Sequence, residues 1–104
     1  MKGVIVMNIV KNQKGSALEV ALEGRLDTVT APELQAEMES ALAGVESVTF
    51  DLTKLEYISS AGLRTLLYIH KQMMGKGGMK LENLNEIVRE VFDVTGFSDV
   101  LTIA

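Results

Sequence analysis

Two adjacent serines, Ser59 and Ser60, are the residues of this chain best placed to take part in chemistry. They follow an apolar segment, Val48 to Leu52, that predicts a buried strand, and they precede Ala61-Gly62-Leu63, which predicts the start of a helix. A hydroxyl at a helix N-terminus lies among unpaired backbone N–H groups and at the positive end of the helix dipole. That position suits a serine that caps the helix, and it suits a phosphate equally well.

An enzymatic role for these serines is not expected, because a nucleophilic serine needs a base within hydrogen-bond reach. The only histidine, His70, lies ten residues after Ser60 on the same predicted helix, which is about 15 Å along its axis. One histidine and no cysteine also serve metal binding poorly. The sequence therefore predicts a protein that is not an enzyme and that uses no metal and no cofactor.

Length and charge restrict the remaining functions. A chain of 104 residues predicts a single domain over residues 1–104. Its net charge of −4 disfavours contact with phosphate backbones, so nucleic acid is not an expected partner. The apolar run Val4 to Met7 is too short for a membrane span or a signal peptide. We therefore expect a soluble, cytoplasmic protein with no membrane partner.

Hydrophobic periodicity predicts the elements that hold the serines in place. Two N-terminal strands, beginning at Val4 and ending at Leu26, are expected to form a hairpin, and three helices then alternate with single strands. Right-handed crossovers favour parallel pairing of those later strands. The predicted fold is α/β, with a mixed sheet of four to five strands and three main helices. Its later strands are expected at Ser47–Thr53, Met79–Glu82 and Val100–Ile103.

Local signals refine this outline. Thr30-Ala-Pro-Glu33 predicts a capping box at the first helix, and Asn85 and Gly96 are expected to bound the third. The second helix is expected to bury a stripe from Leu63 to Met74. Gly62 removes side-chain bulk beside the serines, and a partner approaching the hydroxyl could use that gap.

The sequence resembles the STAS-domain anti-sigma factor antagonists of bacteria over nearly its whole length. The resemblance is carried by Gly24-Arg-Leu-Asp27, by Asp51-Leu-Thr, by Tyr57-Ile-Ser-Ser-Ala-Gly-Leu-Arg64 and by Val91-Phe-Asp-Val-Thr-Gly-Phe97. It implies the STAS fold and a phosphoprotein that regulates transcription by partner switching. The unphosphorylated form of such a protein binds an anti-sigma factor that is also a serine kinase, with an ATP-binding, histidine-kinase-like fold. Binding releases the sigma factor, phosphorylation ends the binding, and a PP2C-type phosphatase resets the switch.

The family's phosphorylated serine lies two residues before the motif glycine, which implies Ser60, with Ser59 as the alternative. Loops that leave the same sheet edge are expected to form the partner-binding surface, and the free protein is expected to be a monomer. That surface comprises Asp27, Thr28, Ser59, Ser60, Gly62, Leu63 and Arg64. We expect Gly62→Trp to abolish partner binding without loss of stability. Two other functions are open: a STAS scaffold or sensor that does not switch, and a partner switch whose output is not a sigma factor.

Overall fold

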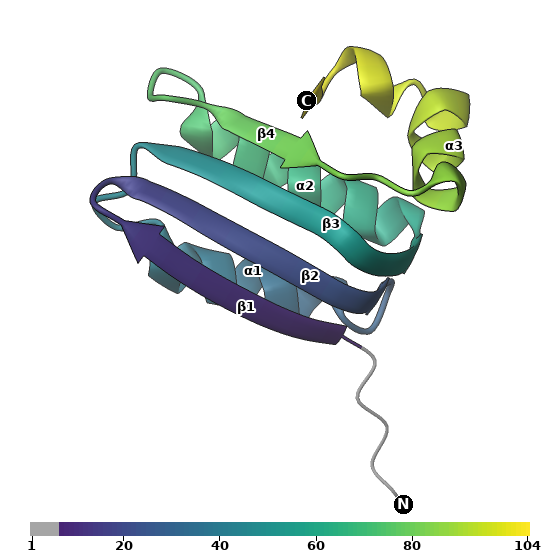
Figure 1. Cartoon of the computed structure of the whole chain (residues 1–104), viewed down its shortest axis with the longest axis horizontal. Helices are drawn as coiled ribbons and strands as arrows, with labels where there is room; N and C mark the ends of the chain where they lie inside the picture. Colours follow the sequence, from purple (N-terminus) through teal and green to yellow (C-terminus); the bar gives the residue numbers. More distant parts are fainter. Residues whose placement is uncertain (1–6) are drawn as a thin grey trace, which may run out of the picture.

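A mixed five-stranded sheet forms the centre of the structure, with strand order β1-β2-β3-β4-β5 (Figure 1). The computed structural model describes residues 7–104, so the predicted strand start at Val4 lies outside the described residues. The strands are β1 (Met7–Lys14), β2 (Ala17–Leu26), β3 (Ser47–Ile58), β4 (Met79–Glu82) and β5 (Thr102–Ile103). The helices are α1 (Ala31–Ala41), α2 (Ser60–Met73), α3 (Glu86–Thr95) and a short 3-10 helix, η1 (Phe97–Asp99).

The strand pairing confirms the predicted fold. β1 pairs antiparallel with β2, and the hairpin turns at Gly15, whose φ of 63° is one that glycine adopts readily. β2 pairs in parallel with β3, and β4 pairs in parallel with β3 and β5. The pairing of β3 with β4 runs from Val48 opposite Met79 to Asp51 opposite Glu82. The sheet is therefore mixed, with an N-terminal hairpin and parallel strands joined through helices.

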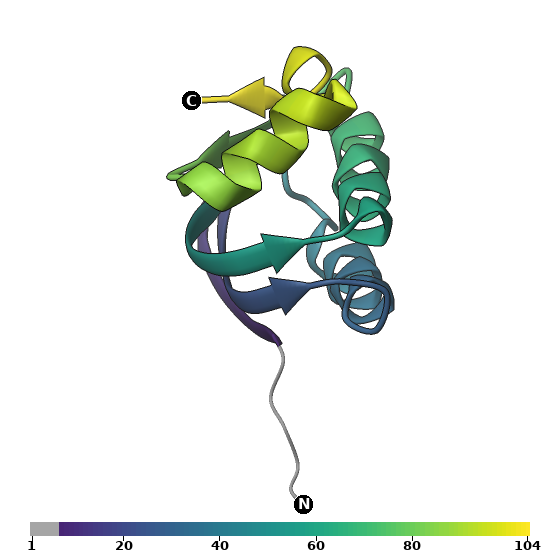
Figure 2. The same ribbon diagram turned by 90° about the vertical axis from the view of Figure 1, so that its right-hand side faces the viewer.

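One face of the sheet is covered by α1 and α2, which lie side by side (Figure 2). Alternation along β2 shows why this face is the core: Leu18, Val20 and Leu22 are buried, whereas Glu19 between them is exposed. Burial of the apolar stripe on each helix against these side chains is the main stabilising contribution to the fold.

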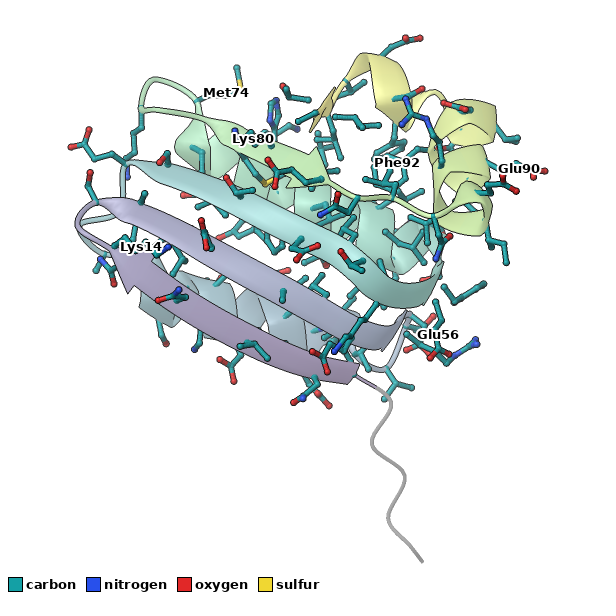
Figure 3. The ribbon with its side chains drawn as sticks, viewed as in Figure 1. Lys14, Glu56, Met74, Lys80, Glu90 and Phe92 are labelled. Atoms are coloured by element: carbon teal, nitrogen blue, oxygen red, sulfur yellow. The ribbon has the colours of Figure 1, made fainter. Side chains whose placement is uncertain are left out.

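The third helix packs at the end of the sheet where β3 finishes (Figure 1). The Asn85 side chain accepts a hydrogen bond from the Val88 N–H at 2.8 Å and donates one to the Leu55 carbonyl at 2.7 Å. Phe92 points from α3 into the core and is fully buried (Figure 3). Gly96 ends the helix with a φ of 82°. The predicted boundaries of this helix, Asn85 and Gly96, are confirmed.

Two predictions about the middle of the chain are wrong. β3 does not end near Thr53 but continues to Ile58, with shifts in its register to β2, so a strand rather than a loop leads to the serines. Met74 is 64% exposed and points away from the protein (Figure 3), because the helix ends at Met73 and the backbone of Met74 is extended. The buried residue at this end of α2 is Met73.

Candidate functional site

The β2–α1 loop and the start of α2 meet at the edge of the sheet where β2 and β3 end. Leu26 lies opposite Ile58 in the parallel pairing, and the Ser59 N–H donates to the Leu26 carbonyl at 2.9 Å. This hydrogen bond joins the β2–α1 loop to the start of α2. The prediction that Asp27 and the serines come together at one sheet edge is confirmed.

The β2–α1 loop is built around the side chain of Asp27. Its Oδ1 atom accepts hydrogen bonds from the Val29 N–H at 3.0 Å and the Thr30 N–H at 3.1 Å, and its carbonyl accepts from the Ala31 N–H at 2.8 Å. The Thr30 hydroxyl donates to the Arg25 carbonyl at 2.8 Å and accepts from the Asp27 N–H at 2.8 Å. The predicted capping box at Thr30 is therefore wrong, because the threonine side chain bonds backward to the strand and Asp27 caps the turn.

These hydrogen bonds determine the ionisation of Asp27. The backbone N–H of Thr30 lowers the pKa of the Asp27 carboxyl most, with further lowering by the Val29 N–H, by the Thr30 hydroxyl and by the Arg25 charge. Partial removal from water opposes this shift. Asp27 is thus held as a carboxylate, with Oδ2 at 3.6 Å from Arg25 Nε. The loop that it organises exposes Thr28 and Val29.

The two serines have different environments. Ser59 is the N-cap of α2: its hydroxyl oxygen accepts a hydrogen bond from the Gly62 N–H at 3.4 Å, and its carbonyl accepts one from the Leu63 N–H at 2.9 Å. Ser60 is the first residue of the helix and is exposed, and within residues 7–104 its hydroxyl has no hydrogen-bond partner. One serine therefore holds the helix start, and the other presents a hydroxyl to solvent.

Gly62 is a packing residue, not an opening for a partner. A Cβ atom at this position would lie 2.7 Å from Leu26 Cγ and 2.9 Å from both the Leu26 carbonyl oxygen and Ile58 Cγ1. The expectation that Gly62→Trp leaves stability unchanged is therefore wrong. Leu63, predicted to contact a partner, is 1% exposed and belongs to the core. Both residues lie beneath the surface around Ser60, and neither has a side chain that a partner could contact there.

Arg25 and Tyr57 form a part of this surface that the sequence did not suggest. The Arg25 guanidinium lies over the Tyr57 ring, 4.3 Å from its centroid, and the two residues are opposite each other in the parallel pairing. The Arg25 side chain is 50% exposed and Tyr57 is 36% exposed. No sequence motif indicated this pair, because 32 positions separate its members and only the strand register brings them together.

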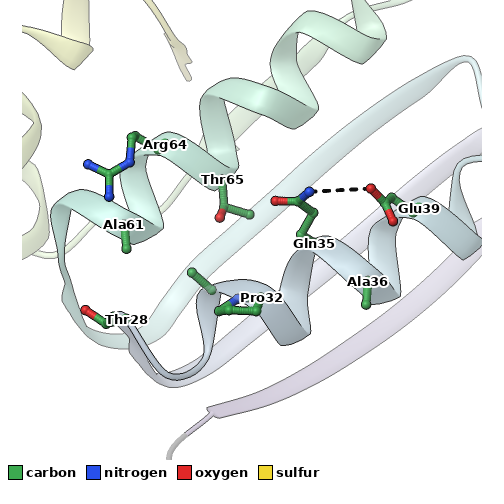
Figure 4. Close-up of a pocket in the computed structure, with 9 residues that line it drawn as sticks. Thr28, Pro32, Gln35, Ala36, Glu39, Ala61, Arg64 and Thr65 are labelled. Atoms are coloured by element: carbon green, nitrogen blue, oxygen red, sulfur yellow. Dashed lines mark hydrogen bonds between the residues drawn. The ribbon is translucent and has the colours of Figure 1, made fainter.

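A groove of about 400 Å³ separates α1 from α2 beside the serines (Figure 4). Thr28 and Ala61 line the end of the groove near the serines, and Arg64 stands at the same end. Glu39, farther along, accepts hydrogen bonds from Gln35 at 3.4 Å and from the Tyr68 hydroxyl at 3.1 Å. The Glu39 hydrogen bond raises the pKa of Tyr68. Among the described residues that line the groove, the one carboxylate is Glu39, which lies at the end away from Thr28 and Ala61 (Figure 4).

Residues 7–104 hold no group of three or more His, Cys, Asp or Glu side chains placed to bind a metal ion. His70 lies on α2 with a buried Nδ1 atom that has no hydrogen-bond partner in the described part of the chain. None of the described helices is both long enough and apolar enough to span a membrane.

The chain is similar in sequence to known proteins that share one domain type. Residues 8–104 match the family model of the STAS domain. The chain belongs to the STAS domain family. This STAS domain is 35% identical over 100 residues to BtrV of Bordetella bronchiseptica, a candidate anti-sigma factor antagonist, covering 94% of this chain and 86% of BtrV. It is 28% identical over 99 residues to the anti-sigma-B factor antagonist of Bacillus subtilis, covering 94% of this chain and 91% of that protein.

Solved structures confirm the STAS fold. The anti-sigma factor antagonist from Mycobacterium paratuberculosis superposes with a TM-score of 0.84 at 20% identity, covering 93% of this chain and 84% of that one. The phosphorylated form of the Bacillus cell fate determinant SpoIIAA superposes with a TM-score of 0.71 at 19% identity, covering 93% and 91%. The resemblance of this STAS domain to anti-sigma factor antagonists is thus found in sequence and in fold.

Proposed function

We propose that this STAS domain is an anti-sigma factor antagonist and that phosphorylation of Ser60 switches off its binding to a serine-kinase anti-sigma factor. The observation that supports this assignment most is the contrast between the serines: Ser60 is exposed with no hydrogen-bond partner among the described residues, whereas Ser59 is engaged as the helix cap. The two curated relatives carry the name of such antagonists, and the structure of SpoIIAA has been solved in its phosphorylated form. All of these relatives are regulators, which agrees with the expectation that this protein is not an enzyme.

We propose that the kinase supplies the base for the phosphorylation step, because the Ser60 hydroxyl has no hydrogen-bond partner within residues 7–104. The Ser60 Oγ attacks the γ-phosphorus of ATP in the kinase, the bond from that phosphorus to the β–γ bridging oxygen breaks, and ADP leaves. The hydroxyl proton passes to a base of the kinase. A PP2C-type phosphatase reverses the switch by hydrolysing the phosphate ester with water, which returns the serine hydroxyl and inorganic phosphate.

The phosphate is expected to act on the interface and not on the fold. It carries about −1.5 to −2 charges at neutral pH, and a negative charge at a helix N-terminus is favoured by roughly 0.3–1 kcal/mol. The folded domain therefore tolerates it. Burial of an unpaired phosphate against a partner costs several kcal/mol in order of magnitude. A tenfold loss of affinity requires only about 1.4 kcal/mol, so local charge is sufficient for release.

The docking surface proposed here follows the exposed side chains around Ser60. It combines Thr28 and Val29 of the β2–α1 loop with Arg64 of α2, and it extends to the stacked pair Arg25 and Tyr57. Asp27, Ser59, Gly62 and Leu63 hold this surface in place from within. A partner that covers Ser60 must come close to the β2–α1 loop and to the start of α2.

The test is to incubate the protein with ATP and an anti-sigma factor kinase from the same organism, and then to map phosphopeptides by mass spectrometry. We expect one phosphate on Ser60. Ser60→Ala should abolish it, and Ser59→Ala should retain it as the matched control. Phosphate on Ser59 alone would overturn the site assignment. Tight binding with no phosphorylation would instead support a scaffold role.

A further inference from the structure

Arg64 lies one helical turn after Ser60, on the same face of α2. Residues four apart on a helix have Cβ atoms about 5–6 Å from each other, and helical side chains lean toward the N-terminus. Figure 4 shows the Arg64 guanidinium lying over the first turn of α2, on the side of Ala61 and not down the groove. The guanidinium is therefore directed to the part of the surface where the Ser60 hydroxyl emerges.

Among residues 7–104, no carboxylate lies within 4.0 Å of the Arg64 guanidinium. The acid that shares its groove, Glu39, is already engaged by Gln35 and Tyr68. Arg25, the other arginine near the serines, lies on the Tyr57 ring and 3.6 Å from Asp27. Arg64 is thus the arginine at this surface with no anionic partner in the described structure.

We propose that Arg64 binds the phosphate on Ser60 within the same chain, so that its guanidinium is no longer available to contact the partner. This inference rests on the proposed function only for the presence of the phosphate. A guanidinium presents two parallel N–H donors that match phosphate oxygens, and such charge-assisted pairs are stronger than neutral hydrogen bonds. Phosphorylation then changes the docking surface twice: it adds negative charge at Ser60 and it removes the accessible cation of Arg64.

The pairing has a consequence that needs no partner to measure. A guanidinium beside the phosphate favours its dianion, so it lowers the second pKa of phosphoserine, which is about 6 in the free residue. Arg64 therefore keeps the phosphate doubly charged at a pH where an isolated phosphoserine is partly protonated. A lysine in its place keeps the charge but loses the paired donors, so it should lower this pKa less.

The test uses the full chain with phosphoserine incorporated at position 60 during translation, titrated by phosphorus NMR. We expect the second pKa in the wild-type background to be about 0.5 lower than in Arg64→Gln, which corresponds to about 0.7 kcal/mol at 1.36 kcal/mol per pKa unit. Arg64→Lys should lie between them. Lys71→Gln is the matched control, because it removes one positive charge from the same helix about 16 Å from Ser60.

Equal second pKa values of the phosphoserine in the wild type and in Arg64→Gln would overturn the inference. It would also be overturned if Lys71→Gln raised this pKa as much as Arg64→Gln does. Both substituted residues are exposed, so circular dichroism should find all variants folded. The outcome is separable from the proposed function. A kinase that fails to phosphorylate Ser60 refutes the function even if the ion pair forms, and an absent ion pair leaves the phosphorylation result intact.

Discussion

Replacement of Gly62 by alanine should destabilise the domain, although alanine is the better helix former. The added Cβ would lie 2.7 Å from Leu26 Cγ and 2.9 Å from the Leu26 carbonyl oxygen, closer than Cβ atoms in folded proteins approach atoms to which they are not bonded. That carbonyl also accepts the hydrogen bond from the Ser59 N–H, so it cannot move without disturbing the helix start. Overpacking of this kind costs about 1–3 kcal/mol, and the gain in helix propensity returns at most about 1 kcal/mol. These two figures leave a net loss between about 0 and 3 kcal/mol, and because the backbone carbonyl cannot give way we expect about 1–2 kcal/mol.

The assay is thermal unfolding followed by circular dichroism, where this loss corresponds to a decrease in melting temperature of roughly 5–10 °C for a domain of this size. Leu26→Ala provides the internal check, because it removes the closest contact atom. The double variant should be less destabilised than the sum of the two single variants. A Gly62→Ala protein as stable as the wild type would refute the packing argument and restore Gly62 to the docking surface.

Three further predictions concern residues around this contact. Ser59→Ala should lower the free energy of unfolding by about 0.5–2 kcal/mol through loss of the cap, whereas Ser60→Ala should stay within about 0.5 kcal/mol of the wild type. Urea denaturation of the two variants measures this difference. Equal losses of stability would contradict the roles assigned to the two serines. Because the folded-state pKa of Asp27 is depressed, its charge stabilises the fold above the ordinary value of 3.8 and ceases to do so as the pH falls through the folded-state value. The melting temperature of Asp27→Asn should therefore lie below that of the wild type at pH 7, with a difference that shrinks at acidic pH; a pH-independent difference would exclude the charge as its cause. Tyr57→Ala should weaken partner binding about tenfold, or about 1.4 kcal/mol, and Tyr57→Phe should keep the ring under Arg25 and retain affinity; calorimetry that finds both variants equal to the wild type would place the interface elsewhere.

The order of strands and helices could be predicted because local signals agreed with the fold. The alternation from Leu18 to Leu22, the asparagine cap at Asn85 and the glycine at position 96 each have one dominant structural use. Single-helix crossovers then required parallel pairing, which placed Asp27 and the serines at one edge.

The errors arose where a residue type has two uses that only tertiary contacts distinguish. A threonine followed three residues later by glutamate predicts a capping box, but the Thr30 hydroxyl reaches the Arg25 carbonyl at 2.8 Å, and Asp27 supplies the cap. Gly62 could have faced solvent or the strand beneath it, and its orientation depends on where β3 ends. The pairing of Arg25 with Tyr57 depends on register shifts that no local pattern encodes.

The central claim is that a phosphate on Ser60 changes the interface and leaves the fold intact. The most direct measurement is the dissociation constant of the complex with the anti-sigma factor kinase, determined by calorimetry for protein with serine and with phosphoserine at position 60. Thermal unfolding of the two forms provides the control, and their melting temperatures should agree within a few degrees. We expect the phosphorylated form to bind at least tenfold more weakly, a difference of about 1.4 kcal/mol or more. Equal dissociation constants, or weaker binding accompanied by unfolding of the phosphorylated domain, would contradict this account.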